Sequence, residues 1–181
     1  MPLPITLHRA ELYDNKTKRF ITIKEKNIVL EHSLLSISKW EAVWHKPFFS
    51  QAKKTDEEFR DYIRCMTLTQ NVEPSDYLAL TADQVEMIIR YMEDKQTATT
   101  FHNQDQKKSR EIMTNEIVYY LMSEFGIPYE PCQKWHINHL MSLIDVCALK
   151  SQPSKKMPMG DMLKQRKSLN AMRRGKYRTH G

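Results

Sequence analysis

The spacing of apolar residues changes once along this chain, near Ser33, and that change limits the folds the chain can adopt. Before residue 33, apolar side chains alternate with polar ones, as in a half-buried strand; examples are Ile5 and Leu7, then Ile21 and Ile23. After it they recur every third or fourth residue, as on one face of an α-helix. We therefore expect an α+β fold that is mainly α, with a β-rich segment over residues 1–31.

The β-rich segment also includes a run ending with Ile28 and Leu30. Residues 14–17 (Asp-Asn-Lys-Thr) supply turn chemistry, because Asp and Asn tolerate positive φ and bond their own backbone. A β-hairpin or a small three-stranded sheet fits this pattern. Because such a sheet is marginal alone, we expect helices to pack on it.

Capping signals place helices within residues 33–149. Ser33 is an N-cap candidate, and residues 55–58 and 81–84 match the capping box, in which the cap and the third helical residue satisfy each other's backbone amides. The apolar faces expected in these three helices are Leu34, Ile37, Trp40 and Trp44; Phe59, Tyr62, Ile63 and Met66; and Val85, Ile88, Ile89 and Met92.

The rest of the body follows the same rules. Pro74 is expected to begin one turn, and residues 96–108 lack any period and are expected to form a long loop. A helix is expected from Ser109 through Phe125, stopped by Gly126, and another over residues 131–149. The sequence thus predicts a bundle of about five helices. The inward side chains expected in the last two are Ile112, Ile117, Tyr120, Leu121 and Phe125, then Trp135, Leu140, Ile144 and Cys147.

Charge divides the chain into two parts. Residues 150–181 hold ten Lys or Arg and one acid, Asp161, for a net charge of +9, whereas the whole chain carries +6, so residues 1–149 carry −3. We expect a globular body over 1–149 and a basic C-terminal arm over 150–181 that is flexible or folds on a partner, with a short helix beginning at Asp161 and ending near residues 174–176. The arm residues expected to contact the partner are Lys155, Lys156, Met162, Lys164, Arg166, Lys167, Leu169, Met172, Arg173, Arg174, Lys176 and Arg178.

Two kinds of partner fit such an arm. A basic arm can bind nucleic acid, but the body lacks the RRM aromatic signature and the KH loop, so nucleic acid ranks behind protein. The stripe of Met162, Leu169 and Met172 fits a partner's helical groove or an acidic coiled coil. Trp40 and Trp44, one turn apart, either seal the helices over the sheet, which we favour, or form an exposed docking patch.

No motif for catalysis or cofactor binding is present. The four glycines form neither GxGxxG nor a P-loop, and GxSxG and HExxH are absent. Cys132, His136 and His139 lie at i, i+4 and i+7, yet one straight helix points three such side chains at one zinc ion poorly, and no fourth ligand is evident. We therefore expect a non-enzymatic protein without a cofactor or metal. With no 18-residue apolar stretch and no signal-peptide pattern, we expect no membrane association.

Short runs in order along most of the chain resemble a family of small proteins encoded by long-tailed bacteriophages. These runs are LEHSLLSISKWE at 30–41, KPF at 46–48, DYIRCMT at 61–67, TATTF at 97–101, SREI at 109–112, YY at 119–120, WHIN at 135–138, KKM at 155–157, LNA at 169–171 and RR at 173–174. The family is identified with tail assembly chaperones, encoded just before the tape-measure protein.

The resemblance implies a binding role in the host cell cytoplasm. The implied partner is the phage tape-measure protein or the tail tube protein, and many copies on one rod-like partner could use avidity in place of high affinity. A homo-oligomer is left open. Two alternatives also stay open: a virion structural protein of the tail or head–tail junction, located in the virion, and a nucleic-acid-binding accessory protein.

Overall fold

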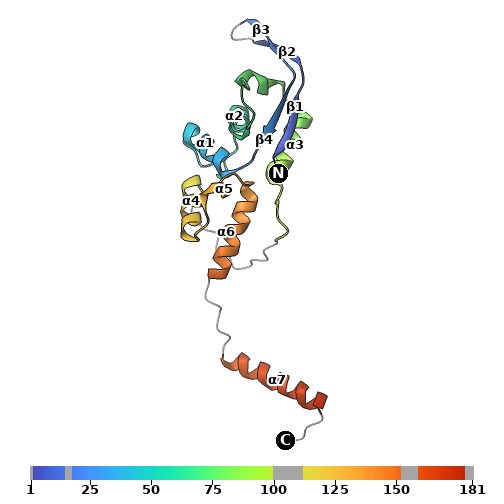
Figure 1. The fold of residues 1–181 in the computed structure, drawn as a ribbon, viewed down its shortest axis with the longest axis vertical. Helices are drawn as coiled ribbons and strands as arrows, with labels where there is room; N and C mark the ends of the chain where they lie inside the picture. The colour runs from blue at the N-terminus through green and yellow to red at the C-terminus, as the bar shows by residue number, and fades with distance from the viewer. Residues whose placement is uncertain (1, 15–17, 100–111, 152–158, 178–181) are drawn as a thin grey trace. The chain divides into compact units, whose positions relative to one another are not determined.

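The computed structural model describes the backbone of residues 2–14, 18–99, 112–151 and 159–177, with their side chains except at residues 14 and 175–177. The fold is α+β and mainly helical, as the apolar spacing predicts (Figure 1). The chain divides into two compact units, Met1–Ala148 and Leu149–Gly181. Within the described ranges, every helix is too short or too polar to cross a lipid bilayer.

The strands form two antiparallel pairs. β1 (Leu3–Leu7) pairs with β4 (Lys26–Leu30), and β2 (Ala10–Asp14) pairs with β3 (Arg19–Ile23). The sequence predicts a hairpin or three strands, and the additional strand is β2, whose apolar Leu12 and Tyr13 are adjacent rather than alternating. Residues 15–17 of the predicted turn lie outside the described ranges. Alternate residues of β1 and β4 are buried, as predicted for Ile5, Leu7, Ile28 and Leu30.

The first two long helices begin where their caps predict. α1 (Leu34–Trp44) is capped by Ser33, whose Oγ accepts from the Ser36 amide while the Ser36 hydroxyl accepts from the Ser33 amide. α2 (Asp56–Met66) begins after Thr55, whose amide donates to Glu58 at 2.7 Å and whose hydroxyl accepts from the Glu58 amide at 3.2 Å. Each pair satisfies two amides that have no partner within the helix.

The next two elements cover the β1–β4 pair. η1 (Pro74–Ala79) is a 3₁₀ turn that begins at Pro74, as predicted, and α3 (Ala82–Glu93) follows the Thr81 capping box. α3 lies against β1, where the Gln84 side chain donates to the Thr6 carbonyl at 2.6 Å. The predicted apolar face of α3 is too wide: Ile88 is fully buried, but Ile89, one residue and 100° away, is 40% exposed.

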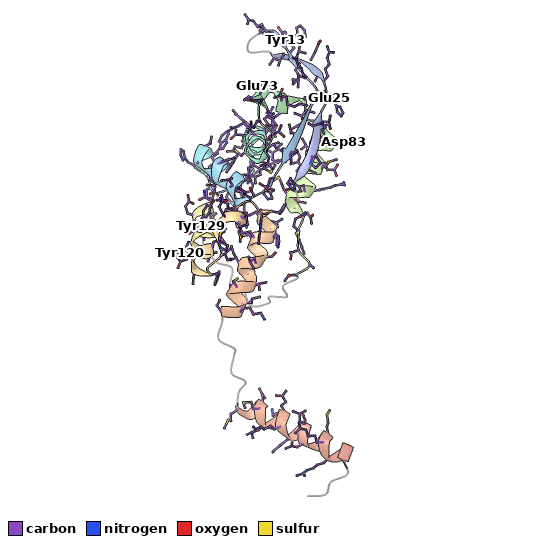
Figure 2. The ribbon with its side chains drawn as sticks, viewed as in Figure 1. Tyr13, Glu25, Glu73, Asp83, Tyr120 and Tyr129 are labelled. Atoms are coloured by element: carbon purple, nitrogen blue, oxygen red, sulfur yellow. The ribbon has the colours of Figure 1, made fainter. Side chains whose placement is uncertain are left out.

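α4 (Asn115–Glu124) is shorter than the helix predicted from Ser109. Ser109 lies outside the described ranges, and Ile112 is exposed and precedes the helix. The buried face consists of Val118 and Met122, whereas Tyr120, predicted inward, is 65% exposed (Figure 2). Gly126 ends the segment, as predicted.

The single helix predicted over residues 131–149 is divided into α5 (Tyr129–Cys132) and α6 (Ile137–Ser151). The residues between them bond to the start of α1 instead of continuing a helix: the Ile137 amide donates to the His32 carbonyl at 2.9 Å, and the Leu35 amide donates to the Gln133 carbonyl. Leu140 and Ile144 are buried in α6, as predicted, while Trp135 and Cys147 are half-buried.

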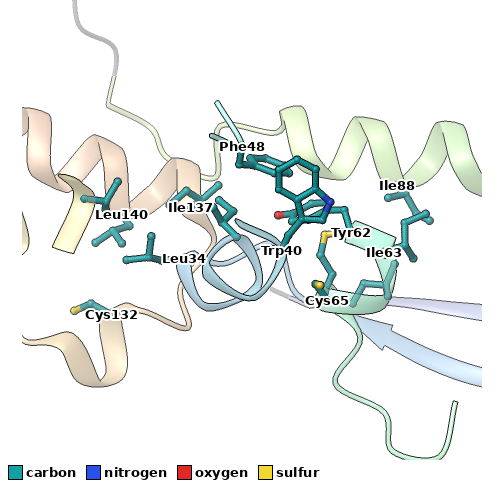
Figure 3. Close-up of a cluster of buried hydrophobic side chains, with 14 of the residues drawn as sticks. Leu34, Trp40, Phe48, Tyr62, Ile63, Cys65, Ile88, Cys132, Ile137 and Leu140 are labelled. Atoms are coloured by element: carbon teal, nitrogen blue, oxygen red, sulfur yellow. The ribbon is translucent and has the colours of Figure 1, made fainter. Parts of the chain in front are cut away.

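One hydrophobic core joins these elements (Figure 3). α1 packs against both α2 and α4. The aromatic centre of the core is the group of Trp40, Phe48 and Tyr62, in which the Phe48 ring lies 5.5 Å from Trp40 and 4.2 Å from Tyr62. Because Phe48 follows α1 and Tyr62 lies in α2, this group locks the two helices together.

Candidate partner-binding surfaces

The second unit contains α7 (Met159–Tyr177), which begins two residues before the predicted Asp161 and runs slightly past its predicted end. Every described side chain of α7 is exposed (Figure 2). Five exposed cations lie on it beside one acid, Asp161: Lys164, Arg166, Lys167, Arg173 and Arg174. Lys176 belongs to the helix, although its side chain is not described, and Lys155, Lys156 and Arg178 lie outside the described ranges.

The same helix exposes five large apolar side chains. These are Met159 (77%), Met162 (44%), Leu163 (52%), Leu169 (47%) and Met172 (73%). In proteins, most helical stability comes from packing an apolar face against something else. Flexible Met side chains adapt to irregular partner surfaces. α7 is thus suited to bind a partner that has apolar surface and negative charge.

The alternative interpretation of Trp40 as a docking residue is wrong, because the structure buries this side chain. Trp40 is 1% exposed, and its indole N–H donates to the Glu58 carbonyl at 2.9 Å. Contact with the Phe48 ring covers it further. Its role is to fill the core, which is the interpretation that the sequence favours.

Trp44, by contrast, is half-buried and borders a groove of about 540 Å³. Its indole N–H donates to Asp61 Oδ2 at 2.9 Å, and Asp61 Oδ1 accepts from Arg64 Nε at 2.7 Å. These bonds hold the indole against α2 but leave part of it in the groove. Trp44 is therefore the one predicted docking aromatic that reaches a described surface.

The groove is built by three elements, and the sequence gives no direct sign of it. α1 contributes Val43 and Trp44, and η1 contributes Pro74, Tyr77 and Leu78. α2 contributes four charged residues in one stripe: Glu57, Arg60, Asp61 and Arg64. The i, i+4 spacing of the two arginines is visible in the sequence, but it is indistinguishable there from an ordinary solvated helix face.

Beside the groove, buried carboxylates serve the fold. Glu58 accepts from Lys46 Nζ at 2.5 Å, and this bond, together with the bond from the Thr55 backbone, lowers the pKa of Glu58. Glu41 accepts from the Phe48 amide at 2.6 Å and from the Asn115 amide at 2.9 Å. Because these carboxylates hold loop and helix ends in place, they are occupied by structural bonds.

A histidine pair lies inside the body. His32 Nδ1 and the Tyr62 hydroxyl are 2.5 Å apart, and the rings of His32 and His136 lie 5.0 Å apart, edge to face. Burial lowers the pKa of His32 to about 3, and the neighbouring His136 adds to the shift; burial also lowers the pKa of His136. Both rings are therefore neutral at pH 7, and they act as hydrogen-bonding core residues.

Cys132, His136 and His139 do not lie on one helix, as their spacing in the sequence would allow. Cys132 lies in α5, His136 lies between the helices, and His139 lies in α6, where its ring stacks on Trp135 at 5.0 Å. Among the described residues, no three His, Cys, Asp or Glu side chains gather closely enough to hold a metal ion.

Comparison of the chain with protein-family models, with curated proteins and with solved structures finds no match.

Proposed function

We propose that this chain is a tail assembly chaperone of a long-tailed bacteriophage, a non-enzymatic protein that binds the tape-measure protein in the host cell cytoplasm. The observation that carries the proposal is α7, a basic helix whose described side chains are all exposed and which presents five Met and Leu side chains. The resemblance of the sequence to phage chaperones supplies the identity of the partner.

The chemistry of α7 supports a helical partner that is acidic and partly apolar. A tape-measure protein is a long helical rod whose apolar seams require cover until the tail tube polymerises around it. A helical segment can cover such a seam, with Met and Leu side chains on the apolar surface and Lys and Arg side chains on flanking carboxylates. Each exposed ion pair contributes only roughly 0.2–1 kcal/mol, so several pairs and several copies are needed for firm binding.

Co-expression tests the proposal. The full chain is produced together with the tape-measure protein of the same phage, and the soluble fraction is compared with that from a variant in which Lys164, Lys167, Arg173 and Arg174 are replaced by Gln. Gln keeps helix propensity while removing charge. We expect the wild-type chain to keep the tape-measure protein soluble and the variant to lose most of that effect.

A matched control carries Gln at four cations of the body: Arg9, Lys18, Lys24 and Lys95. Equal solubility with both variants would contradict the role of α7. Finding the chain at stoichiometric copy number in purified virions would instead favour the structural alternative. If added nucleic acid displaces the tape-measure protein and itself stays bound to α7, the result would favour the alternative of a nucleic-acid-binding accessory protein.

A further inference from the structure

We propose that the exposed side of α3 is a docking surface for α7 of a second copy of this chain, so that copies of the protein associate through contacts of α7 on α3. The inference does not rest on the proposed function, because both surfaces belong to this chain. It goes beyond that function by giving α7 a second partner.

The outer side of α3 carries a mixed stripe of charged and apolar side chains. Glu86, Ile89 and Glu93 are spaced by three and four residues, so they lie in one row along the helix. All three side chains are exposed, and Ile89 lies between the two glutamates. Single exposed apolar side chains are ordinary on protein surfaces, so the charge of the stripe has to select its partner.

The charge of α3 selects a cationic partner. The helix holds three acids and one cation, for a net charge of −2, and the two residues that follow it cancel each other; in order they are Asp83, Glu86, Arg90 and Glu93, then Asp94 and Lys95. Glu86 pairs with Arg90 at 2.6 Å, but both side chains are largely exposed, and such a pair contributes little. Glu93 makes no ion pair with any described residue.

α7 carries the opposite charge in a stripe of its own. Its 19 residues hold six Lys or Arg and one acid, for a net charge of +5. Arg166, Leu169 and Arg173 are spaced by three and four residues, and their side chains are exposed on one side of the helix. Neither arginine forms an ion pair within the described ranges.

The two stripes match in order and in spacing. Each consists of a charge, an apolar side chain and a second charge at i, i+3 and i+7, and seven residues of an α-helix rise about 10 Å. When the helices lie side by side, Arg166 and Arg173 can each meet one glutamate while Leu169 packs on Ile89. Arg binds a carboxylate through two parallel bonds, so the contact combines charge pairing with apolar burial.

A second copy of the chain supplies the occupant because every copy carries both stripes. The arm over residues 150–181 has a charge of +9 and the remainder −3, so the arm of one copy is attracted to the body of another. Two copies can exchange two such contacts, and the second then forms at a raised effective concentration. Association therefore needs no tight single contact.

Charge reversal in the full chain tests the contact. The α3 variant carries Glu86→Lys and Glu93→Lys, and the α7 variant carries Arg166→Glu and Arg173→Glu. Association is followed by sedimentation velocity over a range of chain concentrations, after nuclease treatment and at about 0.15 M salt, where the screening length is about 8 Å. Circular dichroism melting verifies that each variant folds.

We expect the wild-type chain to associate as its concentration rises, and each variant alone to associate at least about tenfold more weakly, because attractive pairs become repulsive. An equimolar mixture of the two variants is expected to recover most of the wild-type association, since every contact between them again joins opposite charges. The matched control carries Glu57→Lys and Glu124→Lys, two exposed acids of α2 and α4. Its association is expected to change by less than about twofold.

The contact is overturned if the wild-type chain stays monomeric at every concentration, or if nuclease abolishes its association, which would assign the association to bound nucleic acid. It is also overturned if the mixture associates no better than the separate variants. The two proposals fail separately. An α3 variant that associates like the wild-type chain, while keeping the tape-measure protein soluble on co-expression, overturns only the α3 contact. A wild-type chain that associates as expected but leaves the tape-measure protein insoluble overturns only the proposed function.

Discussion

The indole of Trp40 is the largest fully buried side chain in the described part of the body. Replacing it with Ala removes its contacts with Phe48 and leaves the Glu58 carbonyl without its indole donor. We expect Trp40→Ala to lower the free energy of unfolding by about 3–5 kcal/mol, measured by urea denaturation. Phe20→Ala is the control, because Phe20 is 73% exposed, and its change is expected to stay within about 0.5 kcal/mol. A loss under about 1 kcal/mol for Trp40→Ala would contradict the burial.

The buried ring of His32 makes stability depend on pH. Its folded pKa of about 3 lies well below the roughly 6.5 of an unfolded chain. Between these values the unfolded chain binds a proton that the folded chain does not. The free energy of unfolding is therefore highest above about pH 6.5 and decreases as the pH falls below that value. This one group lowers the free energy of unfolding by roughly 1.4 kcal/mol per pH unit in that window. The lowered pKa of His136 acts in the same direction.

Urea denaturation at pH 7, 6 and 5 measures that slope. His32→Asn is expected to be less stable at pH 7 but to lose less stability per pH unit than the wild-type chain. Comparing variants is necessary because burial raises the pKa of Glu31 and of Asp145, and those carboxyls act in the opposite direction. His8→Asn, at an exposed position, serves as the control and should keep the wild-type slope. If stability depends on pH as steeply in His32→Asn as in the wild-type chain, His32 is not the cause of that dependence.

Among the elements, the end of α4 depends on Gly126. This residue has φ +66°, its amide donates to the Ser123 carbonyl, and the Ile127 amide donates to the Met122 carbonyl at 2.8 Å. A side chain at such a left-handed position costs roughly 1 kcal/mol, although nothing lies within 4 Å of the position that a Cβ would take. We therefore expect Gly126→Ala to lower stability by about 1 kcal/mol in thermal or urea unfolding, and Gly126→Asn, which tolerates this conformation, to lower it less. Equal losses would indicate that packing, rather than backbone strain, sets the cost.

The observed helix ends show which elements the sequence could predict. Caps and stops act within one turn, so the signals at Ser33, Thr55, Thr81 and Gly126 placed helix ends close to where the structure has them. The break between α5 and α6 depends on a bond from Ile137 to the His32 carbonyl, more than a hundred residues away in the chain. Local spacing carries no information about such a bond.

The two candidate surfaces, α7 and the groove, also differ in how far the sequence predicts them. The exposed helix α7 follows from composition, because a strongly basic segment with few apolar residues cannot form its own core. The groove does not, since its walls come from α1 and η1 and its floor from α2. Only the folded chain brings Arg60 and Arg64 of α2 beside the exposed Val43 and Leu78.

At the scale of the whole molecule, the uneven charge is the property that sets binding conditions. The arm over residues 150–181 carries +9 and the remainder −3. Interactions between exposed charges weaken as salt rises, because the screening length falls from about 10 Å at 0.1 M to about 3 Å at 1 M. Apolar contacts, such as those that the Met and Leu side chains of α7 can make, are not weakened in this way, since salt does not screen them. The charged contacts and the apolar contacts of α7 should therefore respond differently to salt.

Titrating salt separates them. Raising sodium chloride from 50 to 500 mM is expected to weaken binding of the full chain to the tape-measure protein by about tenfold, because five exposed pairs of roughly 0.3 kcal/mol each amount to about 1.5 kcal/mol. The α7 variant with Gln at Lys164, Lys167, Arg173 and Arg174 should start weaker and show a much flatter salt dependence. Parallel slopes in the wild-type chain and the Gln variant would mean that the cations of α7 take no part in the complex.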